Sequence, residues 1–308
     1  MNYIIVLNWN SERETIKCVE SLRNLDNFSN CRVIVVDNNS HKKSYDSILE
    51  YFILNYENEF IEIGEKEAVS YNIDHNLYLI RNEGNYGYAG GNNIGIKFAL
   101  KFESMSYVWI LNNDTIVQTN SLKFMLHKFL ENNNYGVVGS RLVQLENKSN
   151  VQGVGGIINS WLCTTKEIGS DLNINDAIDE KKFEEKIDYV IGASLLISRD
   201  CLETVGLLCE DYFLYYEEID YCNRAKSKGF LIGIASKSVV FHAHGASTNK
   251  GKSLIADYYS VRNRILITRK FYPNKLIFVK LSIFLVCFNR MKRFQFSRAF
   301  KYLKFMFI

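Results

Sequence analysis

"VWILNNDTIV", residues 108–117, is a run of strand-forming residues that ends in two asparagines and an aspartate. A buried strand that stops on a carboxylate places an acid at the rim of a sheet, where α/β proteins bind their ligands. The same residue types also form turns at strand ends. The stretch alone therefore leaves two interpretations open, a simple turn and a ligand-binding edge at Asp114.

The first half of the chain alternates strand and helix patterns, which predicts a parallel α/β sheet. A capping box over 11–14 should begin the first helix, and 40–76 should be largely irregular, with a helix near 48–54. Successive strands stop on polar residues, so we expect a ligand cleft at one sheet edge. The strands are expected over 3–10, 32–38, 77–82 and 106–114, and the edge residues are Asn8, Asp37, Asn82 and Asp114.

The second half is less regular. It predicts strands over 136–143, 188–200, 230–235 and 237–243, with a helix beginning near Tyr216. We find no internal repeat, and the single proline gives no proline-rich linker.

Charge is distributed unevenly along the 308 residues. From Tyr258 onward there are 12 Lys or Arg and no Asp or Glu, which leaves 25 basic against 34 acidic residues in 1–257. The apolar stretches 275–288 and 300–308 are too short and too interrupted by lysine to span a bilayer comfortably. This composition predicts a segment that lies on an anionic membrane surface. The alternative is a basic helical appendage that packs on its own body or in a homodimer.

The seven cysteines are scattered and form no CxxC pair, so neither a disulfide framework nor a cysteine zinc site is expected. A reducing cytosol fits this pattern best. The N-terminus has no basic region before its apolar residues and is expected to form a core strand, not a signal peptide. No nucleic-acid partner is expected.

The glycine-rich run over 81–95 lies between an expected strand and an expected helix, where its backbone N–H groups could contact a phosphate or a sugar. Its spacing is not that of a P-loop, because no lysine follows at the required position. Gly84 and Gly91 belong to this run.

Two further clusters could carry chemistry. In "YYEEIDYCNR", three acids begin a helix, where they complement its dipole; Glu217 and Glu218 are adjacent and must point differently. One of these two could enter the cleft as a general base while an arginine holds the other. In "VVFHAHGAST", His242 and His244 are candidate metal ligands, against the alternative of structural histidines.

Taken in order, eight motifs resemble those of family 2 glycosyltransferases of the rhamnosyltransferase-like and galactofuranosyltransferase-like branch. The resemblance covers about residues 3–270, and the ordered set is specific although each motif alone is weak. The segment 41–76 and the C-terminal tail lie outside it. The motifs are "VLNWN", "VVDNNS", "RNEGNYGYAGGNNIGI", "ILNNDT", "GASLLISRD", "FLYYEEIDYCNR", "FHAHGAST" and "DYYSVRNR".

The resemblance implies the α/β A-type glycosyltransferase fold, a Rossmann-like mixed sheet flanked by helices, here followed by a basic, apolar helical tail. Residues 1–270 would form the catalytic domain, with a nucleotide-sugar-binding half over 1–115 and an acceptor-binding half over 116–270. Outside the resemblance, the basic and apolar composition of residues 271–308 predicts an amphipathic membrane-associating segment.

The resemblance also implies roles for single residues. Asp114 and His242 would bind Mg²⁺ or Mn²⁺, Glu218 would be the catalytic base, and His244 falls where the family often has glycine. Asn112 replaces the first acid of the family's Asp-x-Asp motif. Glu217, Asp220 and Arg224 would support the base. Asp37 would contact the nucleotide base, and the expected donor-binding set is Asn8, Asp37, Asn82, Gly84, Gly91, Asn112 and Asn113.

These residue types suit sugar transfer from a nucleotide-sugar donor. The departing diphosphate needs a cation with oxygen ligands, and the acceptor hydroxyl needs a carboxylate to take its proton. One such carboxylate opposite the leaving group inverts the anomeric centre. The expected enzyme is peripheral on the cytoplasmic face of the membrane and extends a lipid-linked glycan of a cell-surface polysaccharide such as an O-antigen or capsule. The resemblance alone implies the donor that we expect first, dTDP-rhamnose.

Three alternatives remain. The donor could instead be a UDP-linked galactofuranose, hexose or N-acetylhexosamine. A sugar-phosphate nucleotidyltransferase would normally have a glycine loop after the first strand, which "LNWNSERE" lacks. A catalytically inactive nucleotide-binding protein is the third.

Overall fold

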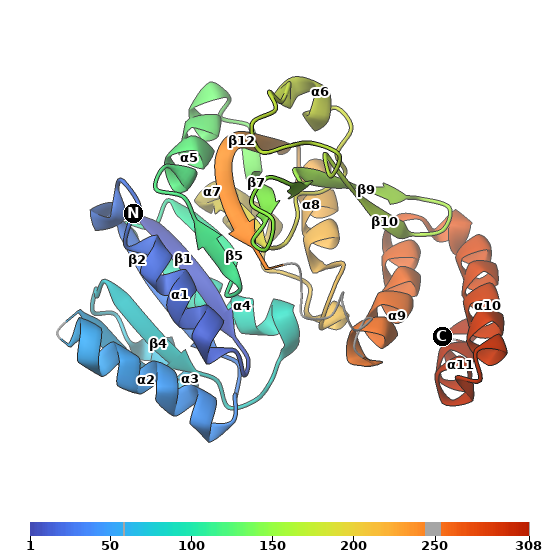
Figure 1. Ribbon diagram of the computed structural model, residues 1–308, viewed down its shortest axis with the longest axis horizontal. Coiled ribbons are helices and arrows are strands. Elements are labelled where there is room, and N and C mark those ends of the chain that lie inside the picture. Colours follow the sequence, from blue (N-terminus) through green and yellow to red (C-terminus); the bar gives the residue numbers. More distant parts are fainter. Residues whose placement is uncertain (58, 244–253, 308) are drawn as a thin grey trace.

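A large mixed sheet organises the computed structural model, which describes residues 1–57, 59–243 and 254–307 (Figure 1). Within these residues the sheet has ten strands. Their order is β3 (Phe60–Gly64), β4 (Leu77–Arg81), β2 (Cys31–Asp37), β1 (Asn2–Asn8), β5 (Tyr107–Asn112), β11 (Ser194–Ser198), β7 (Tyr135–Gln144), β12 (Leu231–His242) and β6 (Thr115–Val117), with β8 (Val151–Gly153) paired to β7.

Strands β4, β2, β1 and β5 run parallel, which brings their carboxyl ends to one edge. In this register Asn8 lies opposite Asp37, and Leu7 lies opposite Asn112. The predicted polar edge is therefore confirmed. Strand β11 runs antiparallel to both β5 and β7, so the sheet is mixed, as the expected fold requires.

Alternating side chains of each strand feed two separate cores. In β1, Ile4 and Val6 face one core, whereas Tyr3 and Ile5 face the other. The first core is closed by α1 (Glu12–Leu22), α2 (Lys42–Tyr56) and α5 (Ser121–Glu131). The second is closed by α4 (Gly87–Leu100), α7 (Arg199–Val205) and α8 (Glu217–Ser227). Burial on both faces explains the continuous apolar runs of the parallel strands.

Some sequence-based expectations were wrong. The stretch 40–76 contains α2, β3 and α3 (Glu65–Ser70) and is not largely irregular. Strand β3 escaped prediction because it is an edge strand that buries only Ile63. The capping box over 11–14 does not form, because the Ser11 hydroxyl donates to the Glu14 carboxylate, 3.3 Å away, and caps no backbone N–H.

The expected strands of the second half also differ from the structure. The strand expected over 188–200 is limited to Ser194–Ser198. The two strands expected over 230–243 are one long strand, β12, whose register shifts between Ala235 and Val239. This irregularity separates the two apolar runs and makes them look like independent strands.

A hairpin and three helices lie to one side of the sheet (Figure 1). The hairpin is formed by β9 (Gly155–Asn159) and β10 (Thr164–Ile168), and the short helix α6 (Glu180–Glu184) follows it. The C-terminal helices are α9 (Leu254–Phe271), α10 (Leu276–Lys292) and α11 (Phe296–Leu303). Buried Asp257 of α9 joins them, because it accepts hydrogen bonds from Arg290 of α10 at 2.9 Å and Tyr302 of α11 at 2.5 Å. Among the described residues, no helix has the length and apolarity needed to cross a bilayer.

Gly87, the first residue of α4, is a point where the fold requires glycine. Its φ is +71°, and an added Cβ would clash with the backbone oxygen of Phe213. We expect Gly87→Ala to lower the free energy of unfolding by about 2–4 kcal/mol, measured by urea denaturation. Gly64→Ala is the control, because no atom lies within 4 Å of its added Cβ and its φ is −75°. Equal stability of the two variants would contradict this account.

Candidate active site

The polar edge of the parallel strands is a connected hydrogen-bond network. Asn8 donates to Asp37 Oδ1 at 2.7 Å, and Asp37 Oδ2 accepts from the Ser40 backbone at 3.0 Å. Asn8 Oδ1 accepts from the Thr15 hydroxyl at 2.9 Å, and Thr15 accepts from Asn113 at 2.9 Å. Asn8 and Asp37 are fully buried. The predicted donor residues Asn8, Asp37 and Asn113 therefore belong to one rigid group.

The glycine-rich run is attached to the same edge through Asn38. The side-chain oxygen of Asn38 accepts from Asn82 Nδ2 at 3.1 Å, and its nitrogen donates to the backbone oxygen of Gly87 at 3.0 Å. At Gly91 an added Cβ would lie 2.5 Å from Leu7, so the absence of a side chain lets α4 pack on β1. Gly84 lies beside the ring of Tyr86.

Asp114 and His242 are brought together by strand pairing. Strands β6 and β12 are antiparallel, with His242 opposite Thr115, and the Ala243 N–H donates to the Asp114 backbone oxygen at 3.0 Å. His242 Nε2 lies 3.2 Å from Asp114 Oδ1. Asn112 Nδ2 lies 3.5 Å from the same Nε2. The predicted metal pair is thus adjacent, with Asn112 beside it.

The donor atoms of this pair fit a divalent cation. His242 Nδ1 lies 2.8 Å from Gln152 Oε1, and donation to that oxygen leaves Nε2 without a proton. Nε2 and the Asp114 carboxylate are then two acceptors 3.2 Å apart, an arrangement that a cation bridges. Within the described residues, no cluster of three or more His, Cys, Asp or Glu could hold a metal. Further ligands would have to come from a bound diphosphate, water or other side chains.

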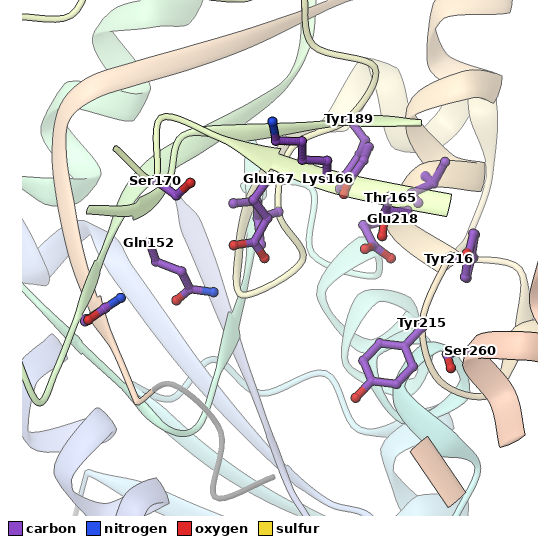
Figure 2. A pocket seen from close by; sticks show the side chains of 13 residues that line it. Gln152, Thr165, Lys166, Glu167, Ser170, Tyr189, Tyr215, Tyr216, Glu218 and Ser260 are labelled. Carbon is purple, nitrogen blue, oxygen red and sulfur yellow. The ribbon is translucent and has the colours of Figure 1, made fainter. Parts of the chain in front are cut away.

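Glu218 lines a cavity of about 540 Å³ between the sheet, the hairpin and α9 (Figure 2). Gln152, which holds His242, lines the same cavity, as do Lys166 and Glu167 of β10. Burial raises the pKa of Glu218 to about 7, and the negative charge of Glu167 adds to this shift. A carboxyl group with such a pKa can accept a proton near neutral pH.

The neighbouring Glu217 is buried, and its Oε2 has no hydrogen-bond partner. Burial, followed by the charge of Glu218, raises the pKa of Glu217 well above its ordinary value. The prediction that an arginine could hold one of these two glutamates is wrong, because Arg224 pairs with Asp220 at 2.6 Å. Asp220 is fully buried and also accepts from Lys270 of α9 at 2.5 Å. Arg224 and Asp220 thus tie α8 to its surroundings.

Sequence reasoning missed two residues of this site. Gln152 gave no signal, because its role depends on the pairing of β8 with β7. Tyr88 donates from its hydroxyl to the Gly192 backbone oxygen at 2.6 Å. Burial raises the pKa of Tyr88, as do the charges of Glu217, Glu218 and Asp114, so these groups surround it. The sequence signal for Tyr88 is its position in the glycine-rich run, directly after Gly87. His244, the other candidate ligand, lies outside the described residues.

The comparison with protein families agrees with this geometry. A family model described as glycosyl transferase family 2 matches residues 3–206. The chain belongs to this family.

Two curated proteins of this kind are similar in sequence. The chain is 26% identical over 201 residues to the low-salt glycan biosynthesis hexosyltransferase Agl10 of Haloferax volcanii, a match that covers 65% of this chain and 62% of Agl10. It therefore spans less than two thirds of that relative. It is 24% identical over 289 residues to the dTDP-rhamnosyl transferase RfbF of Shigella flexneri, covering 92% of this chain and 84% of RfbF.

Solved structures share the fold. The structure of GalNAc-T7 with UDP, GalNAc and Mn²⁺ matches with a TM-score of 0.62 and 14% identity, covering 85% of this chain and 47% of that one. The mannosyltransferase PcManGT of Pyrobaculum calidifontis, with GDP-Man and Mn²⁺, matches with a TM-score of 0.55 and 13% identity, covering 99% and 86%. The expected A-type glycosyltransferase fold is confirmed.

The burial of Glu217 makes stability depend on pH. The pKa of Glu217 is higher in the folded state than the value of about 4.3 in the unfolded chain. The protonated carboxyl group therefore contributes its full stabilisation below about pH 4.3, and this contribution is lost as the pH rises through the folded-state pKa. We expect Glu217→Gln to remove this contribution, so its melting temperature should fall less than that of the wild type between about pH 5 and 8. Exposed Glu185→Gln is the control and should follow the wild type. Parallel curves for Glu217→Gln and the wild type would refute the assignment.

Proposed function

We propose that this chain transfers a sugar from a nucleotide-sugar donor to an acceptor hydroxyl, with inversion of the anomeric centre. The observation that carries the proposal is the cavity shared by Glu218 and Gln152, because Gln152 holds His242 beside Asp114. One cavity thus joins a carboxylate suited to take a proton with a pair suited to hold a cation.

In the proposed reaction, Glu218 accepts the proton of the acceptor hydroxyl as its oxygen attacks the anomeric carbon. The bond from that carbon to the acceptor oxygen forms while the bond to the diphosphate oxygen breaks, with the electron pair leaving on the diphosphate. A Mg²⁺ or Mn²⁺ held by Asp114 and His242 supplies positive charge for that diphosphate. Burial raises the pKa of Glu217 well above its ordinary value, which favours its neutral form and reduces the negative charge beside the base.

The proposed donor is dTDP-rhamnose, supported by similarity to RfbF along 92% of this chain. A UDP-linked hexose, galactofuranose or N-acetylhexosamine is the alternative, and the TarS structure from S. aureus in complex with UDP-GlcNAc, TM-score 0.53, has the same fold. The proposed donor site is the polar edge, with Asn8, Asp37 and Asn82 at its base.

The proposed acceptor is a lipid-linked glycan on the cytoplasmic face of a membrane. The tail supports this part of the proposal, because residues 258–308 contain twelve basic and no acidic residues. In the described part of the tail, α10 also exposes large apolar side chains, among them Phe284, Leu285 and Phe288.

Nucleotide release from a panel of dTDP-, UDP- and GDP-sugars tests the function. With Mg²⁺ or Mn²⁺, we expect release from one donor, reduced about 100-fold or more in Glu218→Gln by loss of the base and in Asp114→Ala by loss of the metal ligand. His242→Ala should reduce release by loss of the second metal ligand, and His127→Ala, on the exposed face of α5, is its control. Release that survives both Glu218→Gln and Asp114→Ala would show that the site is misplaced. Metal-dependent nucleotide binding without turnover, with or without acceptor lipid, would indicate an inactive binding protein.

The pH dependence of transfer tests the role of Glu218 separately. Because the base must be ionised and its pKa is raised to about 7, kcat/KM should rise with pH and level off above that value. Below the transition the expected slope is about tenfold per pH unit. The measurement is kcat/KM across about pH 5.5–8.5. A flat profile over this range would exclude Glu218 as the group that limits the rate.

A further inference from the structure

A second cavity, of about 580 Å³, lies between the start of α9 and helix α11. We call it the tail groove. Its wall is largely aromatic: Phe213 stacks on Tyr259 with ring centroids 4.8 Å apart, and Phe296 contributes from α11. Leu254 and Ile255 add aliphatic surface and are more than half exposed. A long apolar chain would find continuous apolar surface here.

The tail groove also carries positive charge. Arg298 and Lys301 of α11 line it, and no acidic residue does so in the described part of the chain. Arg298 makes a long ion pair with Asp257, 3.7 Å from its nearest oxygen. Both carboxylate oxygens of Asp257 already accept 2.9 Å bonds from Arg290. An aromatic wall beside two cations is complementary to a molecule with an apolar chain and an anionic head.

Phe294, at the rim of the tail groove, is held in a conformation that favours glycine. It ends the α10 segment with φ +57°, and its side chain is 83% exposed. A bulky residue in the left-handed region costs free energy, and here no burial offsets that cost. Its ring packs edge-on against Phe296 at 6.1 Å between centroids, which extends the aromatic wall outward.

Consecutive residues of α9 line the tail groove and the cavity that contains Glu218. Tyr258 and Tyr259 line the groove, whereas the next residue, Ser260, lines the cavity that contains Glu218. Phe213, in the groove wall, accepts from the Tyr88 backbone N–H at 2.7 Å, and the hydroxyl of Tyr88 binds Gly192 beside Glu218. A ligand in the groove would therefore lie next to the cavity that contains Glu218.

From this arrangement we infer that the tail groove binds the lipid phosphate of the acceptor, with the chain on Phe296 and its neighbours and the phosphate on Arg298 and Lys301. The inference rests on the proposed function, because it assumes a lipid-linked acceptor. The groove would hold the acceptor so that its glycan enters the neighbouring cavity. It assigns the tail a defined ligand site in addition to any contact with the bilayer surface.

Titration calorimetry of the full chain with decyl phosphate, below its micelle concentration, tests the inference. Decanol and inorganic phosphate are the two comparison ligands, because each presents only half of the chemistry. Decyl phosphate should bind most tightly. Phe296→Ser should weaken it about tenfold through lost apolar contact, and Lys301→Gln should weaken decyl phosphate without weakening decanol. Phe284→Ser, exposed on α10 and outside the groove, is the matched control and should bind as the wild type does.

Four results would overturn the inference. These are equal binding of decyl phosphate and decanol, unchanged binding in both groove variants, equal loss in Phe284→Ser, and a wild-type dimer that Phe296→Ser dissociates. The third would mean that the whole tail surface adsorbs lipid, and the fourth that a second copy fills the groove.

Nucleotide binding by the wild type is measured in parallel. Nucleotide binding without decyl phosphate binding would refute only the proposed ligand of the tail groove. Absence of nucleotide binding would refute the proposed transferase function.

Discussion

The antiparallel pairing of β12 with β6 is the constraint on which the candidate site depends. Asp114 and His242 are distant in sequence, and only this ladder places the imidazole beside the carboxylate. The same strand β12 pairs in parallel with β7, which also pairs with β8, and β8 supplies Gln152 to His242. Four strands, β6, β7, β8 and β12, therefore fix the orientation of one imidazole ring, and a ligand fixed in advance would lose little freedom on binding a cation.

The acids of α8 show how burial assigns different roles to similar side chains. Asp220 has two cations and is held as a structural anchor, whereas Glu217 has no partner for one oxygen and burial raises its pKa well above the ordinary value. Glu218 lies between these extremes, partly buried at the wall of a cavity. The three acids begin one helix, so its dipole favours all of them alike. Their different surroundings, not their position in the helix, distinguish the proposed base Glu218 from Glu217 and Asp220.

Residues that depend on local pattern could be predicted from sequence, and residues that depend on long-range pairing could not. Asn8, Asp37 and Asp114 end or follow strongly apolar strands, so their common edge followed from the parallel sheet. The pairing of Arg224 with Asp220 was missed although its i, i+4 spacing favours it, because Glu217 lies seven residues, or two turns, from Arg224. Gln152 could not be found because its neighbours come from β8, a strand of three residues without a strong pattern. Edge strand β3 was missed for a similar reason, since it buries only Ile63.

The tail and the catalytic cavity are parts of one packed unit through the β9–β10 hairpin. Between its strands, Trp161 packs on Phe278 of α10 at 4.9 Å between centroids, and the backbone oxygen of Leu162 accepts from Arg264 of α9 at 2.8 Å. The next strand of the same hairpin, β10, supplies Lys166 and Glu167 to the cavity of Glu218. Through these contacts α9 and α10 are joined to the hairpin, so a displacement of α10 would alter its packing against Trp161. A tail that binds lipid would therefore also hold β10, which lines the cavity of Glu218. The same contacts would then set the position of the proposed acceptor and the surroundings of the proposed base.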